Sequence, residues 1–231
     1  MAGGLGTRMR PVTETIPKPM IQVAGKPFLQ HQLELLHASG IDRSLLLVAY
    51  LGENIEEYFG DGEKLDLDID YSYEQTPLGT GGALKNAEGK LQNSFVLLNG
   101  DTYLGIDYSA LLLKFATLQC SALIVAYKKP HGALSGLPAD HVSNNLFVDK
   151  EGRVEAYRKR DSEGLTHIDA GAIVLNKKIL QTLPAGQRCS LEEEIYPKLI
   201  ADEDMFAWVT QEPFYDMGSP AGLAALEEKL S

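Results

Sequence analysis

Residues 3 to 19 read Gly3-Gly4-Leu5-Gly6-Thr7-Arg8-Met9-Arg10-Pro11-Val12-Thr13-Glu14-Thr15-Ile16-Pro17-Lys18-Pro19. The three closely spaced glycines allow the backbone to turn and to bring its N–H groups near an anion, which a Cβ would prevent. Arg8 offers a fork of donors suited to phosphoryl oxygens, and Lys18 stands between two prolines that restrict where its ammonium points. The stretch is therefore typical of a loop that binds a polyphosphate, although glycine clusters also occur in ordinary turns. It is not a P-loop, because no Gly-Lys-Ser/Thr follows the glycines.

The chain after this loop alternates between strand-like and helix-like stretches, which predicts an α/β fold. Leu29, Leu33 and Leu36 repeat at helical spacing, and Ser39-Gly40 is a helix stop. The pattern predicts further helices after the second glycine loop and at 52–59, 108–118, 177–183, 191–201 and from Ser219 onward. It predicts strands at 45–49, 67–71, 95–98, 122–127, 146–149, 154–157, 172–175 and 206–210. Residues 128–145 show little periodicity and are interpreted as a long connection or flap.

Polar and glycine-rich segments follow several of these strands. Pro77-Leu78-Gly79-Thr80-Gly81-Gly82-Ala83 is a second glycine loop that leads into a helix, and Asn99-Gly100-Asp101 follows the apolar run 95–98. Ligands of open α/β sheets gather outside the carboxyl ends of the strands, so Asp101 is a candidate site residue. It can also be read as a strand end and helix cap. Ser190 with Glu193 forms a capping-box pattern before the helix at 191–201.

The composition narrows the classes of protein. The chain has 231 residues, 44% of them hydrophobic, and a formal net charge of −11, which suits one α/β domain and disfavours a nucleic-acid partner. No apolar run approaches the roughly 18 residues that span a bilayer, and no signal-peptide pattern is present. We therefore expect a cytoplasmic protein that binds no membrane, with Cys120 and Cys189 as plain thiols. A small anionic substrate is compatible with the charge if Mg²⁺ and local cations offset it.

Four motifs carry a resemblance to a known family. They are Gly-Gly-Leu-Gly-Thr-Arg with Pro17-Lys18-Pro19, the second glycine loop, Leu98-Asn99-Gly100-Asp101, and Tyr215-Asp216-Met217-Gly218-Ser219-Pro220. Together they resemble the sugar-1-phosphate nucleotidyltransferases, the NDP-sugar pyrophosphorylases. Segments 74–84 and 98–103 look most like bacterial D-glycero-D-manno-heptose 1-phosphate guanylyltransferases. The resemblance implies one Rossmann-like (GT-A type) domain over 1–231, a three-layer sandwich with a mixed, mostly parallel sheet flanked by helices. Residues 1–127 would form its nucleotide-binding half and 128–231 its sugar-phosphate-binding half.

The resemblance also implies roles for individual residues. Asp101 and Asp216 would hold Mg²⁺, Arg8 would take the charge that develops on pyrophosphate, and Lys18 would approach the phosphates. The catalytic set is Arg8, Lys18 and Asp101. The remaining nucleotide contacts would come from Gly3, Gly4, Gly6, Thr7, Glu74, Gly79 and Thr80. The sugar phosphate would contact Asn99, Lys159, Asp169, Gly171 and Glu192. Glu74 suits guanine, because a carboxylate accepts from its N1–H and 2-amino donors, but it can serve other bases.

The expected activity is Mg²⁺-dependent transfer of a nucleotidyl group from an NTP, with GTP as the expected donor, to a hexose or heptose 1-phosphate. Uridylyl, cytidylyl or thymidylyl transfer is the alternative, as is a silent nucleotide-sugar binding protein. A retaining glycosyltransferase is disfavoured, since Asp101 is followed by Thr102 and Tyr103 rather than by an Asp-x-Asp pair. The partners are the NTP and the sugar 1-phosphate, and a homo-oligomer is left open.

Three departures from the family pattern are present. Arg158 stands where the family usually has an acidic residue, and Asn144-Asn145 stands where it has Tyr-Gly, so the acceptor need not be the heptose. The family also has a short apolar strand before the first glycines, whereas here Met1 lies directly on the loop. We therefore expect the first strand to be missing from this chain. Either the true start lies upstream, which is our hypothesis, or the chain is a damaged form that could be inactive.

Overall fold

The computed structural model describes residues 1–4, 9, 11–130 and 142–231. Its α-helices are α1 (Phe28–Ala38), α2 (Gly52–Phe59), α3 (Gly79–Asn86), α4 (Tyr108–Leu118), α5 (Tyr196–Ala201) and α6 (Pro220–Leu230). Its strands are β1 (Gln22–Val23), β2 (Lys26–Pro27), β3 (Arg43–Val48), β4 (Asp68–Tyr73), β5 (Ser94–Leu98), β6 (Thr102–Leu104), β7 (Ala122–Tyr127), β8 (Leu146–Val148), β9 (Val154–Tyr157), β10 (Ile168–Asn176), β11 (Met205–Thr210) and β12 (Phe214–Asp216). Short 3₁₀ helices cover Val12–Glu14, Lys18–Met20, Glu63–Leu65 and Lys177–Thr182, and a π-helical turn covers Leu191–Ile195. No helix in these described ranges is long and apolar enough to cross a membrane.

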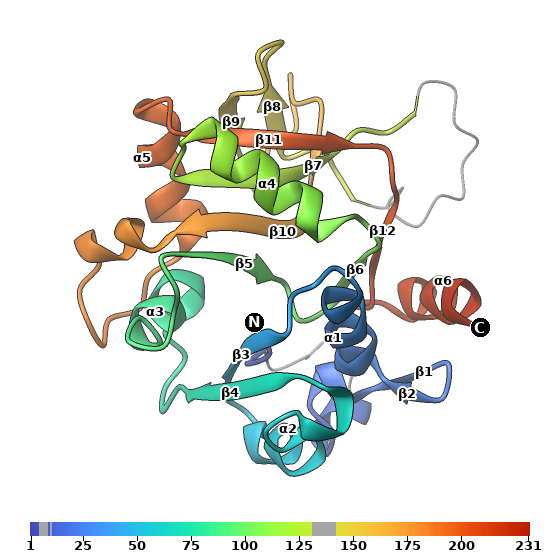
Figure 1. Cartoon of the computed structure of the whole chain (residues 1–231). Coiled ribbons are helices and arrows are strands. Elements are labelled where there is room, and N and C mark those ends of the chain that lie inside the picture. The colour runs from blue at the N-terminus through green and yellow to red at the C-terminus, as the bar shows by residue number, and fades with distance from the viewer. Residues whose placement is uncertain (5–8, 10, 131–141) are drawn as a thin grey trace.

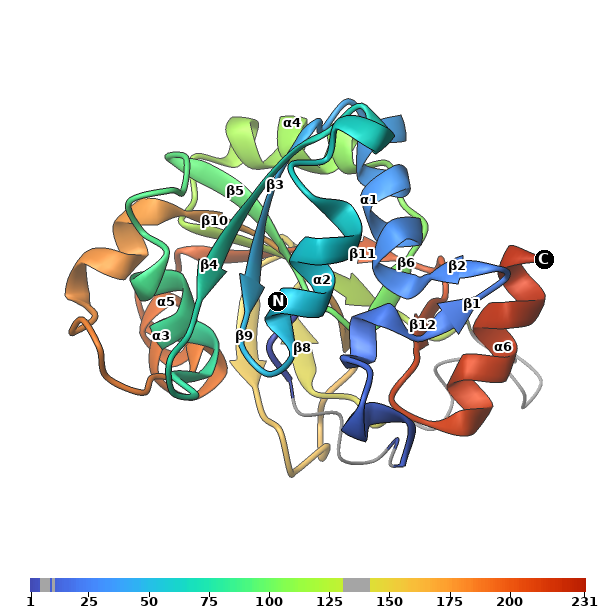
Figure 2. The same cartoon turned by 90° about the horizontal axis from the view of Figure 1, so that it is seen from below.

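A four-stranded sheet in the order β11-β7-β10-β5 forms the middle layer (Figure 1). All six residues of β7 are buried, and successive side chains point to opposite faces of the sheet. Leu123 and Val125 pack with α4 on one face, whereas Ile124 packs with α3 and α5 on the other. Helices therefore cover both faces, and the predicted α/β sandwich is confirmed (Figure 2).

Strand directions agree with a mixed, mostly parallel sheet. β11 is parallel to β7, and β10 runs antiparallel to both β7 and β5. In the four-stranded sheet, β11, β7 and β5 therefore point in one direction and β10 in the other. β3 is parallel to β4. β3 and β4 form a separate two-stranded sheet, which packs with α1 and α2 through Leu33, Val48 and Ile55.

Residues 1–4 form no strand and lie between the two sheets. The Ala2 N–H donates to the Leu47 carbonyl of β3 at 2.8 Å, and the Met1 ammonium donates to the Leu98 carbonyl of β5 at 2.9 Å. Beside them is a cavity of about 470 Å³ lined by both strands and by apolar residues of α1. Burial of the Met1 ammonium lowers its pKa to about 6, although the negative charges of Asp101 and Glu74 oppose this shift. Met1 and Ala2 therefore connect β5 to β3 by hydrogen bonds.

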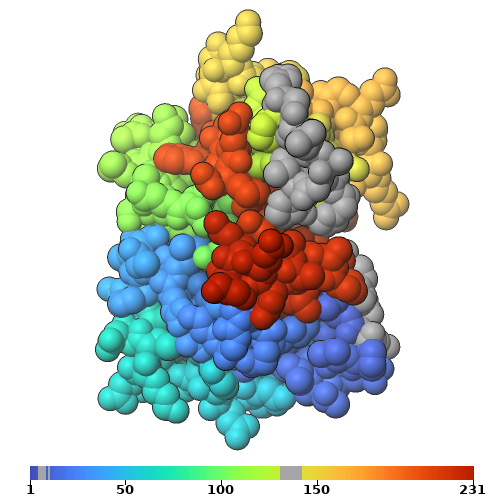
Figure 3. Space-filling view, turned by 90° about the vertical axis from the view of Figure 1, so that its right-hand side faces the viewer, coloured from blue at the N-terminus to red at the C-terminus, as the bar shows by residue number. Residues whose placement is uncertain are grey.

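Helix α6 joins the end of the chain to its beginning. It packs against β1 and β12, with Leu226 in one apolar cluster with Val23, Phe28 and Met217. The Ala24 N–H donates to Glu227 of α6 at 2.8 Å. Figure 3 shows the helix lying across the boundary between the N-terminal residues and the C-terminal part of the sheet.

Some predicted elements differ from the observed ones. Strand β12 was not among the predicted strands, and it pairs with β6. The helix expected at 191–201 opens with the π-helical turn before α5 begins. The Ser190 hydroxyl accepts from Glu193 N–H as predicted, but the Ser190 N–H donates to Glu194, one residue later than a capping box requires. Because a π-helical turn contains more residues than an α-helical turn, the carboxylate that accepts the Ser190 N–H belongs to Glu194 instead of Glu193. Most of the flap expected at 128–145 lies outside the described residues.

Candidate active site

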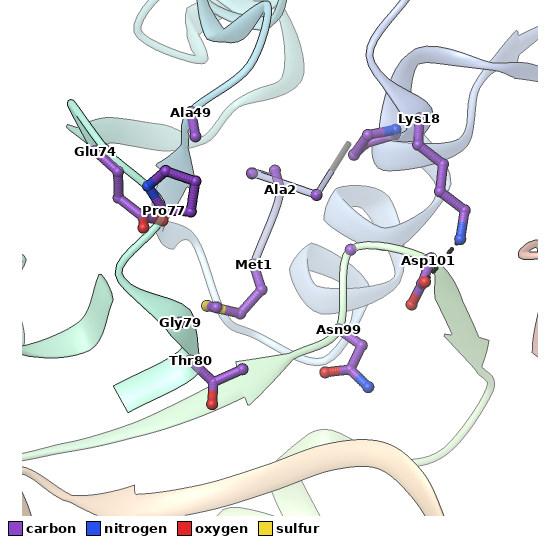
Figure 4. A pocket seen from close by; sticks show the side chains of 14 residues that line it. Met1, Ala2, Lys18, Ala49, Glu74, Pro77, Gly79, Thr80, Asn99 and Asp101 are labelled. Atoms are coloured by element: carbon purple, nitrogen blue, oxygen red, sulfur yellow. Dashed lines mark hydrogen bonds and ion pairs between the residues drawn. The ribbon is translucent and has the colours of Figure 1, made fainter. Parts of the chain in front are cut away.

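A cavity of about 400 Å³ opens at the carboxyl ends of β3, β4 and β5 (Figure 4). In the figure, Glu74 and Pro77 lie on one side of this pocket and Lys18 and Asp101 on the other. The pocket is lined by Met1, Ala2, Gly3, Gly4, Lys18, Pro19, Ala49, Glu74, Pro77, Gly79, Thr80, Asn99, Gly100 and Asp101. It therefore brings both glycine loops and the Asp101 turn to one place.

The first glycine loop enters this pocket next to β3. A Cβ on Gly3 would lie 3.1 Å from the Ala49 Cβ and 3.4 Å from a carboxylate oxygen of Glu74, so the backbone passes closer than a side chain comfortably allows. Gly6, Thr7 and Arg8 lie outside the described residues, and their phosphate contacts stay predictions.

Lys18 and Asp101 form an ion pair at the opposite side. The Lys18 Nζ lies 2.7 Å from Asp101 Oδ2, and the lysine side chain is only 9% exposed. The Thr102 hydroxyl donates to the other Asp101 oxygen at 3.3 Å. The Lys18 ammonium thus pairs with the carboxylate that is predicted to bind the metal.

The turn that carries Asp101 is held by Gln32, a residue that the sequence analysis missed. Gln32 is buried in α1, and its Nε2 donates to the carbonyls of Asn99 at 2.9 Å and Thr102 at 2.8 Å. The available signal was a polar side chain beside Leu33, on the apolar face of a predicted helix. Buried amide groups are normally hydrogen-bonded, and both hydrogen bonds of Gln32 go to the Asp101 turn. Gln32 therefore positions this turn without lining the pocket.

Asp216 is brought to the same turn by the β6–β12 pair. Asp216 is the register partner of Thr102, and the Met217 N–H donates to the Asp101 carbonyl at 3.0 Å. A Cβ on Gly222 would lie 1.9 Å from the Asp216 carbonyl oxygen, which explains a glycine in the first turn of α6. Two carboxylates on adjoining backbone segments are the oxygen ligands that a hard divalent cation prefers. The donor set therefore fits a divalent metal.

The second glycine loop is shaped by protein contacts. Glu74 accepts from the Leu78 N–H at 2.9 Å, which fixes the loop at its start. Gly79 has φ +72, and a Cβ there would lie 2.6 Å from the Cys189 carbonyl oxygen. The N–H groups of Gly81 and Gly82 donate to that same carbonyl. Two of the loop's N–H groups therefore bind protein, while Gly79 and Thr80 line the pocket.

The predicted sugar-side residues gather around β9 and β10. Asp169 is partly buried and accepts from the Tyr157 hydroxyl at 3.2 Å and the Gly171 N–H at 2.9 Å. Burial raises its pKa to about 6, helped by the charge of Glu192, whereas these two hydrogen bonds and Lys159 oppose the shift. Gly171 has φ +77, and a Cβ there would lie 3.1 Å from the Asn99 amide nitrogen. The sugar-side cluster therefore adjoins the Asp101 turn.

Lys159 and Glu192 complete this cluster. The Lys159 Nζ lies 3.5 Å from carboxylate oxygens of both Glu192 and Glu193 and is partly exposed. Burial alone would raise the Glu192 pKa, but the Ser190 hydroxyl, a backbone N–H, Lys159 and Thr80 together lower it. An ionised carboxylate beside an ammonium suits a polar ligand with hydroxyl and phosphate groups.

The arrangement defines a class of protein: a Rossmann-like α/β enzyme domain with a carboxylate pair and a glycine-loop pocket at the carboxyl ends of its strands. All 231 residues of the chain match the model of the nucleotidyl transferase family, and the chain belongs to that family. It is a nucleotidyltransferase.

Known relatives and structures agree with this assignment. The chain is 36% identical over 224 residues to the mannose-1-phosphate guanylyltransferase of Mycobacterium tuberculosis, covering 95% of this chain and 60% of that protein. It is 34% identical to the D-glycero-alpha-D-manno-heptose 1-phosphate guanylyltransferase of Campylobacter jejuni, covering 95% of this chain and 93% of the relative. The structure of HddC from Yersinia pseudotuberculosis superposes with a TM-score of 0.82 at 31% identity, covering 100% of this chain and 97% of HddC. HddC has also been solved in complex with GMP-PN.

Proposed function

We propose that this enzyme transfers a guanylyl group from GTP to a mannose or heptose 1-phosphate, giving a GDP-sugar and pyrophosphate. The observation that carries the proposal is the junction of two sites: Lys18 and Asp101 pair at one pocket, and the Asp169 cluster adjoins the Asp101 turn through Gly171. Asp216 supports it, because its strand pairs with the residue that follows Asp101. The activities of the two guanylyltransferases named above support the choice of guanylyl group and of sugar 1-phosphate.

The chemistry needs no general base from the protein. The nucleophile is an oxygen of a phosphate monoester, which is already ionised near neutral pH. The reaction instead requires two polyanions to be brought together, with the attacking oxygen in line with the α-phosphorus. Asp101 and Asp216 would hold Mg²⁺, which supplies charge neutralisation for the phosphates when bound. Lys18, released from Asp101, would then place its ammonium on a phosphate oxygen.

The two sides of the pocket suggest how the substrates divide it. Glu74, Gly79 and the first glycine loop would contact the nucleotide, and the predicted contacts of Gly6, Thr7 and Arg8 belong to the triphosphate. Lys159, Asp169, Gly171 and Glu192 would receive the sugar phosphate. This division corresponds to the two halves, about 1–127 and 128–231, of a single domain.

The test is a pyrophosphate-release screen of GTP, UTP, CTP and dTTP against a panel of sugar 1-phosphates in the presence of Mg²⁺. We expect turnover with GTP and mannose or heptose 1-phosphate. Asp101→Asn and Asp216→Asn should each reduce the rate by about 100-fold or more, because the metal loses a charged ligand. Asp202→Asn, at an exposed carboxylate that ends α5, is the matched control and should act as wild type.

Three outcomes would contradict parts of the proposal. Full activity in either active-site variant would refute the two-aspartate metal site. Faster turnover with another nucleotide would refute the guanylyl assignment. Calorimetric binding of NTP without any turnover would indicate a silent binding protein.

A further inference from the structure

Thr80 joins the nucleotide side of the pocket to the sugar side. Its Oγ donates to a Glu192 carboxylate oxygen, Oε2, at 2.9 Å and accepts from the Leu191 N–H at 2.8 Å. Ser190 donates to the same Glu192 oxygen at 2.6 Å. The Thr80 oxygen points away from Met1 and Ala2 in the pocket (Figure 4). Its hydroxyl is therefore engaged by the sugar-side segment, even though the residue belongs to a nucleotide-side loop.

The backbone around this hydroxyl is tightly fitted. The Cys189 N–H donates to the Leu78 carbonyl at 2.8 Å, and the Cys189 carbonyl accepts from Gly81 and Gly82. A Cβ on Gly82 would lie 2.6 Å from the Gln187 carbonyl oxygen, and one on Gly81 would lie 2.9 Å from the Cys189 Sγ. Any displacement of the loop 78–82 must therefore move the segment 187–192 with it, because close packing transmits small shifts.

Glu192 in turn faces the cluster assigned to the sugar phosphate. It pairs with Lys159 at 3.5 Å, and its charge acts on the partly buried Asp169 and on Tyr157. A long glutamate side chain can adopt many rotamers. Two hydroxyl donors on one of its oxygens select a single orientation.

Resting on the function proposed above, we propose that Thr80 is a positioning residue that orients Glu192 for the sugar and couples sugar 1-phosphate binding to nucleotide binding. The nucleotide contacts the loop at Gly79, the loop carries Thr80, and Thr80 holds the sugar-side carboxylate. Such coupling is reciprocal, so each substrate should raise the affinity for the other.

The test compares Thr80→Val, which keeps the shape but removes the hydroxyl, with Thr80→Ser, which restores it. Calorimetry measures mannose 1-phosphate binding with and without a non-hydrolysable GTP analogue, and steady-state kinetics gives KM for both substrates. Thr80→Val should weaken mannose 1-phosphate binding and raise its KM by about 10-fold, the loss expected for one hydrogen bond to a carboxylate. Binding of the GTP analogue in the absence of sugar phosphate should change less than 2-fold, roughly the scatter of independent sites. The strengthening of sugar binding by the analogue should disappear in Thr80→Val and return in Thr80→Ser.

A double-mutant cycle with Glu192→Gln separates positioning from a structural effect. If Thr80 acts through Glu192, Thr80→Val adds little to the loss already caused by Glu192→Gln. An unchanged sugar KM in Thr80→Val, an equal loss in the binding of each substrate measured alone, or full additivity in the cycle would overturn the inference. If the wild-type enzyme neither binds nor guanylylates mannose 1-phosphate, the function proposed above fails for that sugar and the inference fails with it. Normal wild-type turnover with an unaffected Thr80→Val removes the inference alone.

Discussion

Replacing Asp169 by asparagine should change how the stability of the protein depends on pH. Burial raises the pKa of this carboxyl to about 6 from its ordinary value of 3.8. The native state therefore keeps a proton that the unfolded state has already released, so stability falls as pH rises from about 4 to about 6. A pKa difference of about 2 between the native and unfolded states corresponds to about 3 kcal/mol of unfolding free energy, which is lost in full once the pH is well above 6. Roughly half of this loss falls between pH 5 and pH 7. Asparagine keeps the shape of the side chain but does not ionise.

The assay is urea unfolding of the wild type and Asp169→Asn at intervals from pH 4.5 to pH 8. Other carboxylates titrate in both proteins, so the difference between the two unfolding free energies isolates Asp169. We expect the variant to gain about 1 to 2 kcal/mol relative to wild type between pH 5 and pH 7, while its binding of sugar 1-phosphate weakens. A difference in unfolding free energy that stays constant over this range, or that changes in favour of wild type, would refute the raised pKa of Asp169.

Two further predictions concern residues that shape the pocket without binding substrate. Gly100→Ala should destabilise the protein by about 3 kcal/mol, because its Cβ would lie 1.9 Å from the Met1 carbonyl oxygen. Thermal unfolding measures this loss. The control is Gly89→Ala, whose Cβ meets no atom within 4 Å and which should be nearly neutral. Gln32→Met should leave two carbonyls of the Asp101 turn without their buried donor, which costs about 2 to 4 kcal/mol and lowers kcat. Wild-type stability in the Gln32 variant would show that the turn does not depend on the amide.

The sequence predicts much of the architecture because periodicity reports burial directly. The strands 122–127 and 154–157 and the helices 52–59 and 108–118 agree with β7, β9, α2 and α4 at both ends. The two helices carry apolar residues at helical spacing, and 122–127 is a continuous apolar run of the length typical of a fully buried strand. The short pairs β1–β2 and β6–β12 were missed, because two- or three-residue strands carry no periodic signal and depend on partners far away in the chain.

In the candidate site, too, local motifs were predictable from the sequence and contacts between distant segments were not. Motifs placed Asp101, Glu74 and Lys18 at one pocket, and the structure brings them there. The role of Gln32 was not predictable, because a helical pattern does not say which distant carbonyls a buried amide side chain meets. The glycines of the second loop were recognised by composition, but only the structure reveals that they fit against the backbone at 187–189.

The bridge formed by Met1 and Ala2 has a mechanical consequence. The pocket lies across the seam between the two sheets, with Ala49 and Glu74 on the β3–β4 side and Asn99 and Asp101 beside β5. Met1 hydrogen-bonds to Leu98 of β5 and Ala2 to Leu47 of β3, so the two residues together span that seam. A substrate that contacts both walls would act as an additional cross-link between the two sheets. Occupancy of the pocket and rigidity of the whole domain are therefore linked, and the ligand stabilises the fold by joining its two parts.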